Sequence, residues 1–96
     1  MINNQLIADI KNYVGEHGGS YSGWYAGIAT NPKDRLFSDH NVQEEGGAWI
    51  FNNAGSEQNA RDTEKHLLNI GFDGGDGGGD TPIYVYAYKK TSDTIE

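Results

Sequence analysis

The chain has 96 residues, a length that predicts one domain spanning residues 1–96. The absence of cysteine excludes disulfide bonds, thiolate nucleophiles and cysteine-ligated metal centres. The net charge of −7, from 7 Lys+Arg against 14 Asp+Glu, disfavours broad binding to nucleic acid, because an acidic surface is repelled by phosphate.

The sequence also argues against a membrane or secreted protein. Its apolar runs are all shorter than the roughly 20 residues needed to cross a bilayer. The first residues, MINNQLIADIKN, lack the basic start and apolar stretch of a signal peptide. We therefore expect a soluble, cytoplasmic protein without a membrane partner, and its small size and acidity would suit a phage or a mobile element.

The first half of the chain predicts a helix, a strand and a second helix. Apolar residues at helical spacing predict an amphipathic helix over 3–16, ended by glycine. Aromatic and small residues predict a strand over 23–30, GWYAGIAT. The pair Asn31-Pro32 is expected to start a short helix that runs through Ser38.

The second half predicts a strand, a helix and a final strand. Glycines bound the predicted strand over 48–52, AWIFN, and Ser56 is a good N-cap for a helix that runs to Asn69. Residues 83–88 alternate strictly between aliphatic and tyrosine side chains, which is the clearest strand pattern in the chain. The tail, residues 91–96, is expected to be frayed.

The predicted order of elements is therefore α-β-α-β-α-β. We expect an α+β fold in which a small three-stranded, mainly antiparallel sheet packs with three helices. The glycine-rich segment 71–80, GFDGGDGGGD, precedes the last strand and has three interpretations. It is a simple connector, a flap that covers a substrate, or a Ca²⁺ loop formed by Asp73, Asp76 and Asp80.

One carboxylate in the third predicted helix is unusual. Helical spacing places Glu64 on the apolar stripe that Ala60, Leu67 and Leu68 form. A carboxylate facing a core costs several kcal/mol unless it is paired or bound to a metal. Glu64 therefore lies at the edge of the stripe, pairs with Arg35, or binds a metal such as Mg²⁺, which usually takes one carboxylate and several waters.

The strands carry an unusual number of phenols. Tyr25 points to the opposite side of its strand from its two neighbours, and Tyr84, Tyr86 and Tyr88 share one side of theirs. If all four lie on one face of the sheet, that face carries a row of hydroxyls. The row is either ordinary amphipathic packing or a site that stacks a base or uses a phenol as acid or base.

Three short segments together resemble the YIG half of the GIY-YIG nuclease superfamily. They are Tyr25-Ala26-Gly27, Asn31-Pro32-Lys33-Asp34-Arg35-Leu36 and His40-Asn41. In that family, a strand ending in Tyr-Ile-Gly precedes a helix with an arginine and then a histidine or tyrosine, and a later helix supplies a metal-binding glutamate. The resemblance implies that Tyr25 helps to activate water, that Arg35 stabilises phosphate charge, and that Glu64 binds Mg²⁺ or Mn²⁺.

The sequence departs from the family pattern at two positions in this half. The Tyr-Ile-Gly motif reads Tyr-Ala-Gly here, which is a mild change. His40, the residue matched to the catalytic histidine, lies five residues after Arg35, which is one more than the family spacing, and Asp39 occupies the expected place.

The other half of the family pattern, a strand with its own tyrosine, is missing before Tyr25. We hypothesise that the C-terminal strand supplies it, as a circular permutation would, by lying beside residues 23–30. One of its three tyrosines would then replace the family's first tyrosine, and we assign Tyr86 to this catalytic position. The remaining candidates for substrate binding are Lys33, Tyr84 and Tyr88.

Two functions are compatible with these patterns. The first is a metal-dependent nuclease or phosphodiesterase that acts on nucleic acid or a small nucleotide. The alternative is a binding module that keeps the fold without catalysis, and binds a nucleotide through its tyrosine face or another protein through its acidic surface. A catalytic protein should bind Mn²⁺ through Glu64 and cleave nucleic acid, whereas a binding module should leave it intact. The most informative single observation is whether Tyr25, Arg35, Glu64 and a C-terminal tyrosine meet in one cleft.

Overall fold

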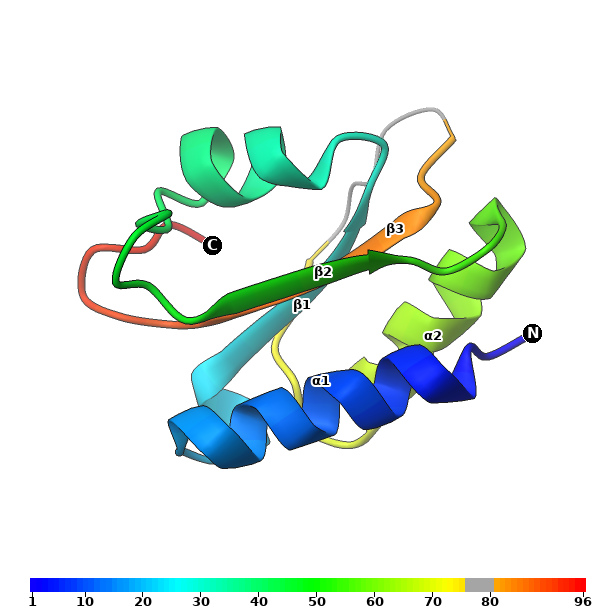
Figure 1. Ribbon diagram of the computed structural model, residues 1–96, viewed down its shortest axis with the longest axis horizontal. Helices are drawn as coiled ribbons and strands as arrows, with labels where there is room; N and C mark the ends of the chain where they lie inside the picture. The colour runs from blue at the N-terminus through cyan, green and yellow to red at the C-terminus, as the bar shows by residue number, and fades with distance from the viewer. Residues whose placement is uncertain (76–80) are drawn as a thin grey trace.

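The fold is α+β, as the sequence predicts. The computed structural model describes residues 1–75 and 81–96 and contains a three-stranded antiparallel sheet with helices on both faces (Figure 1). The elements in chain order are α1 (Asn4–His17), η1 (Tyr21–Gly23), β1 (Trp24–Ala29), η2 (Asp34–Asp39), β2 (Trp49–Asn53), α2 (Glu57–Asn69) and β3 (Tyr84–Lys89). None of the helices in the described part is long and apolar enough to cross a membrane.

Side-chain caps fix where the two long helices begin. The Leu6 amide donates to the Asn3 side chain over 3.0 Å at the start of α1. The Asn59 amide donates to the Ser56 hydroxyl over 3.1 Å at the start of α2, which confirms Ser56 as the predicted cap. Each cap satisfies an amide that has no partner within its helix, so both helices start where the sequence indicates.

The strand that comes last in the chain is the central strand of the sheet. The strand order is β1-β3-β2, and both pairs are antiparallel. β3 therefore lies beside β1, as the permutation hypothesis requires. The register places Tyr88 opposite Tyr25 on one side and opposite Trp49 on the other, with Tyr86 opposite Gly27.

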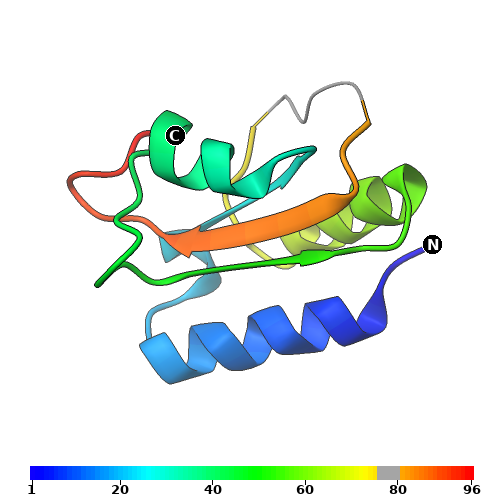
Figure 2. The same cartoon turned by 45° about the horizontal axis from the view of Figure 1, so that its top comes forward.

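The two faces of the sheet pack against different layers. One face lies against α1 and α2 and forms the larger core, which includes Trp24, Ile28 and Val85. The other face carries the tyrosines and lies beneath η2, with Leu36 and Val42 in the second core cluster (Figure 2). Tyr25 shares this face with the β3 tyrosines, as alternation along the strands predicts.

The C-terminal tail is ordered, so the expectation that residues 91–96 are frayed was wrong. The Thr91 amide donates to the Thr94 hydroxyl over 3.0 Å and closes a turn that sends the chain back over the sheet. The Ile95 amide then donates to the His40 carbonyl over 2.8 Å, and the Asn41 side chain donates to the Asp93 carbonyl over 3.0 Å. These backbone contacts hold a polar tail that composition alone marks as mobile.

Gly27 makes room for the Tyr86 ring across the two strands. A Cβ atom added at Gly27 would lie 2.5 Å from the Tyr86 hydroxyl oxygen and 2.6 Å from the adjacent ring carbon. The ring is buried and cannot move aside, because its hydroxyl is bonded to His40 over 2.7 Å. The glycine is therefore needed for its lack of a side chain rather than for an unusual backbone angle.

We predict that Gly27→Ala destabilises the protein by about 1–3 kcal/mol, the usual cost of overpacking a filled core. Gly15→Ala is the matched control, because a Cβ at Gly15 in α1 meets nothing within 4 Å. The control should be neutral or stabilising by up to about 1 kcal/mol, since alanine favours a helix. Urea unfolding measures both changes, and equal stability of the two variants would contradict the packing of Tyr86 on Gly27.

Candidate functional site

A small cavity lies between β1, η2 and the C-terminal tail on the tyrosine face. Its volume is about 190 Å³. It is lined by all five residues that the sequence predicts for catalysis and metal binding, which are Tyr25, Arg35, His40, Glu64 and Tyr86. These residues come from four elements and a turn that lie far apart in the sequence, so their meeting depends on the tertiary fold.

A wide helical turn brings His40 to the cavity. The His40 amide donates to the Arg35 carbonyl over 2.8 Å, a hydrogen bond that spans five residues instead of the four of an α-helix. This turn is one residue longer than a turn of α-helix. It therefore accommodates the one residue by which the spacing from Arg35 to His40 exceeds the family spacing. Both side chains consequently reach the same cavity.

His40 connects β3 to the tail through its two ring nitrogens. Nε2 lies 2.7 Å from the Tyr86 hydroxyl, and Nδ1 lies 2.6 Å from the Ile95 carbonyl oxygen. A carbonyl oxygen only accepts hydrogen bonds, so Nδ1 carries the hydrogen in the neutral ring. Nε2 is then an acceptor, and the Tyr86 hydroxyl donates to it. This tautomer is assigned from the hydrogen-bond partners.

Tyr88, which the sequence predicts as a substrate-binding residue, is not among the residues that line the cavity. Its side chain is fully buried, and its ring stacks on Tyr25 with 5.2 Å between centroids. Its hydroxyl lies 3.4 Å from the Ile95 carbonyl and 3.1 Å from His40 Nδ1. Tyr88 is therefore covered by neighbouring side chains and supports the position of His40 from behind.

The other two substrate-binding candidates lie in a separate groove beside the cavity. Lys33 and Tyr84 line it together with Thr30, Asn31, Pro32 and Phe51, and its volume is about 430 Å³. Tyr84 and Tyr86 are alternate residues of β3, so the groove and the cavity follow one another along the same face of the sheet.

Burial keeps the two phenols and the imidazole of the cavity neutral. Burial, followed by the negative charge of Glu64, raises the pKa of the Tyr25 hydroxyl, against the opposing charge of Arg35. Burial and the neighbouring Tyr25 raise the pKa of Tyr86 well above its ordinary value. Burial lowers the pKa of the His40 imidazole, although its hydrogen bond to Ile95 opposes this change. At pH 7 the site thus combines two neutral phenols with a neutral imidazole.

Arg35 supplies positive charge at the mouth of the cavity. Its Nη1 atom lies 3.3 Å from the Asp39 carboxylate, and about a third of its side chain is exposed (33%). A solvent-exposed pair of this kind contributes at most about 1 kcal/mol. Arg35 can therefore exchange Asp39 for an anion that enters the cavity, at little cost in stability.

Glu64 reaches the cavity from the half-buried edge of α2. Ala60 and Leu67 on the same helix are fully buried, so Glu64 lies beside the core and not inside it. Among the described residues, no three His, Asp or Glu side chains cluster closely enough to hold a metal by themselves. A single carboxylate completed by waters is nevertheless the usual arrangement for Mg²⁺, and Glu64 at the wall of a cavity of about 190 Å³ fits it.

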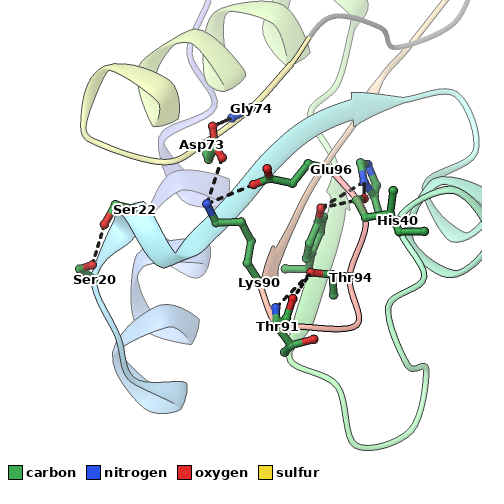
Figure 3. Close-up of polar contacts among 11 residues, drawn as sticks. Ser20, Ser22, His40, Asp73, Gly74, Lys90, Thr91, Thr94 and Glu96 are labelled. Carbon is green, nitrogen blue, oxygen red and sulfur yellow. Dashed lines mark hydrogen bonds and ion pairs between the residues drawn. The ribbon is translucent and has the colours of Figure 1, made fainter.

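Glu96 is a residue of the cavity that the sequence analysis missed. It lines the cavity, and its carboxylate lies 3.1 Å from the Lys90 ammonium, which also binds Asp73 over 3.0 Å (Figure 3). Nothing in a tail of mixed polar residues indicates such a contact. Asp73, proposed as a possible Ca²⁺ ligand, is paired with Lys90 instead, and its suggested partners Asp76 and Asp80 lie outside the described residues.

We predict that the protein loses stability as the pH falls from 7.5 to 5.5. The unfolded chain takes up a proton on His40 near pH 6.5, whereas the folded protein resists it because its pKa is lowered. The contribution of His40 to the free energy of unfolding is therefore fully present above pH 6.5. It is lost as the pH falls below 6.5, by at most about 1.4 kcal/mol per pH unit. Urea unfolding at several pH values measures the slope.

His40→Gln should flatten this slope, because it removes the titrating ring. His66→Gln, which removes an imidazole outside the cavity, is measured beside it as the matched control. An unfolding free energy that stays constant in the wild type between pH 7.5 and 5.5 would contradict the burial of a neutral His40.

Comparisons with protein-family models, with curated proteins and with solved structures were made for the whole chain. None of the three finds a match for it. The case for a function therefore rests on the residues of the cavity and their geometry.

Proposed function

We propose that this protein is a metal-dependent phosphodiesterase of the GIY-YIG type that hydrolyses nucleic acid or a small nucleotide. One observation carries the proposal: Tyr25, Arg35, His40, Glu64 and Tyr86 line a single cavity. The sequence pattern alone points to the same five residues. A phenol hydrogen-bonded to an imidazole can remove a proton from water, and an arginine and a carboxylate-bound metal can neutralise phosphate charge, as phosphodiester hydrolysis needs.

The bond between Tyr86 and His40 provides a path for the proton of an attacking water. As water attacks the phosphorus atom, the Tyr86 oxygen accepts its proton while the Tyr86 proton moves to His40 Nε2 over 2.7 Å. The water oxygen bonds to phosphorus, the opposite P–O ester bond breaks, and the leaving oxygen takes a proton from solvent. His40 then returns its extra proton to solvent, which restores the starting state.

This path assigns the first proton transfer to Tyr86, whereas the family resemblance alone assigns it to Tyr25. Tyr86 is the phenol that donates to a base, and its raised pKa makes it a poor phenolate unless that base takes the proton. Tyr25 lines the same cavity as a neutral hydroxyl, suited to donate a hydrogen bond to a phosphate oxygen.

The charges of the cavity suit a phosphate anion and one divalent cation. Arg35 would leave Asp39 and neutralise negative charge that develops on the phosphate oxygens. Glu64 would hold Mg²⁺ or Mn²⁺, and the bound cation would supply further charge neutralisation at the phosphate.

The size of the site favours a small or single-stranded substrate. The cavity of about 190 Å³ takes a phosphate group and little else. The neighbouring groove offers the Phe51 and Tyr84 rings for a base and the Lys33 ammonium for a flanking phosphate. A net charge of −7 makes long duplexes poor ligands, since each further phosphate meets an acidic surface.

The groove also supports the alternative function of a binding module without catalysis. Its rings and its lysine are suited to hold a nucleotide whether or not the cavity next to it is catalytic. A protein partner on the acidic surface is the other form of this alternative. Both forms predict binding that is independent of Glu64 and of any divalent metal.

We predict that the protein cleaves at least one member of a panel of single-stranded DNA, single-stranded RNA and cyclic nucleotides when Mg²⁺ or Mn²⁺ is present. Glu64→Gln should remove Mn²⁺ binding and reduce cleavage by at least about 10²-fold, the usual effect of losing one group that stabilises transition-state charge. Calorimetric titration with Mn²⁺ and gel or chromatographic assays measure the two effects.

Glu57→Gln is the matched control for this experiment. Glu57 lies on the same helix but pairs with Arg61 on the surface, so both metal binding and cleavage should be retained. A panel that stays intact with both metals would overturn the catalytic proposal and leave the binding module.

We further predict that Tyr86→Phe reduces kcat by about 10²–10⁴-fold, the range for loss of general-base catalysis. Tyr25→Phe should have a smaller effect on kcat and a larger one on KM, because its hydroxyl contacts the phosphate without moving a proton. Steady-state kinetics of the two isosteric variants separate the roles, and a larger kcat loss for Tyr25→Phe would reverse the assignment.

A further inference from the structure

The C-terminal tail crosses the tyrosine face and makes two backbone hydrogen bonds to a single residue. The Ile95 amide donates to the His40 carbonyl over 2.8 Å, and His40 Nδ1 lies 2.6 Å from the Ile95 carbonyl oxygen. The Ile95 side chain is 58% exposed, so this contact depends on the backbone and not on the apolar side chain. The tail is thereby placed to act on the imidazole ring.

Several contacts on either side of Ile95 hold the tail in this position. Lys90 lies between the carboxylates of Asp73 and Glu96, at 3.0 and 3.1 Å (Figure 3). Before Ile95, the Asn41 side chain donates to the Asp93 carbonyl over 3.0 Å. The tail is thus fastened to the turn after η2 and to the segment beside β1, two of the parts of the chain that border the cavity.

A neutral imidazole carries its hydrogen on one of two nitrogens, and its neighbours decide which one. The Ile95 carbonyl oxygen lies 2.6 Å from Nδ1. It would repel a lone pair on that nitrogen, whereas it accepts a hydrogen bond when Nδ1 carries the hydrogen. The Tyr88 hydroxyl supports this arrangement by donating to the same carbonyl over 3.4 Å. With the hydrogen on Nδ1, the lone pair of Nε2 points at the Tyr86 hydroxyl.

We infer that residues 91–96 are a positioning segment for the site, in which the Ile95 carbonyl holds His40 in the tautomer that receives the Tyr86 proton. Without this carbonyl, the hydrogen can move to Nε2, which then donates to the Tyr86 oxygen. Tyr86 can no longer pass its own proton to His40 in that state. The catalytic consequence rests on the proposed function, whereas the tautomer of His40 does not.

The first test measures the tautomer directly by ¹⁵N NMR of the imidazole nitrogens at pH 7.5. We expect Nδ1 of His40 to be protonated and Nε2 to be unprotonated in the wild-type chain. A chain that ends at Thr94 lacks the Ile95 carbonyl and should give a mixture of both tautomers. Ile95→Ala is the control, since it keeps the carbonyl and should keep the wild-type tautomer.

A second variant addresses the case in which the shortened chain does not fold. Ile95→Pro removes the amide that donates to the His40 carbonyl but keeps the chain length, and circular dichroism reports whether either variant is folded. It should shift the tautomer in the same direction by a smaller amount. A wild-type His40 protonated on Nε2, or a folded shortened chain that keeps the Nδ1 tautomer, would overturn the inference.

The second test follows cleavage of the substrate identified in the metal-dependent assay. We expect the chain that ends at Thr94 to lose about 10- to 10²-fold in kcat, a part of what general-base catalysis contributes, while KM changes little. Ile95→Ala, which keeps the carbonyl, should lose much less kcat than the shortened chain. If the wild type cleaves nothing, the proposed function fails while the NMR result still decides the inference. Unchanged kcat with a shifted tautomer would overturn the positioning role.

Discussion

The buried hydrogen bond between the Tyr86 hydroxyl and His40 Nε2 is the interaction on which the site depends. It joins the central strand to the turn after η2, and neither polar group could be buried cheaply without the other. Gly27 must lack a side chain to let the Tyr86 ring approach. The five-residue turn must then deliver His40 to the same point. The hydrogen bond between Tyr86 and His40 thus constrains β3, β1 and η2 together.

The two faces of the sheet have different roles, which explains how a small chain contains both a hydrophobic core and a polar cavity. α1 and α2 cover one face, so most of the aliphatic side chains lie between them and the strands. The other face is covered by η2 and the tail, which leave a cavity lined mainly by polar groups. Tyrosine suits this second face because its ring fills space and its hydroxyl finds a partner at the cavity.

The sequence predicts the parts of the structure that local patterns determine. The strict alternation in β3, the Ser56 cap of α2 and the position of Glu64 beside an apolar stripe are all readable from short windows. The bound tail and the full burial of Tyr88 were missed, because each depends on contacts with His40, which lies far away in the chain. The only sign of the wide turn before His40 in the sequence is that the spacing from Arg35 to His40 is one residue longer than in the family.

The position of β3 in the middle of the sheet sets the order in which the fold can be made. Among the described strands, β1 and β2 each pair with β3 and not with one another, so the three-stranded sheet cannot form until residues 84–89 have been synthesised. Until then the ribosome holds a chain with two unpaired strands and exposed aromatic side chains. Folding therefore requires contacts between distant parts of the chain, which slows it.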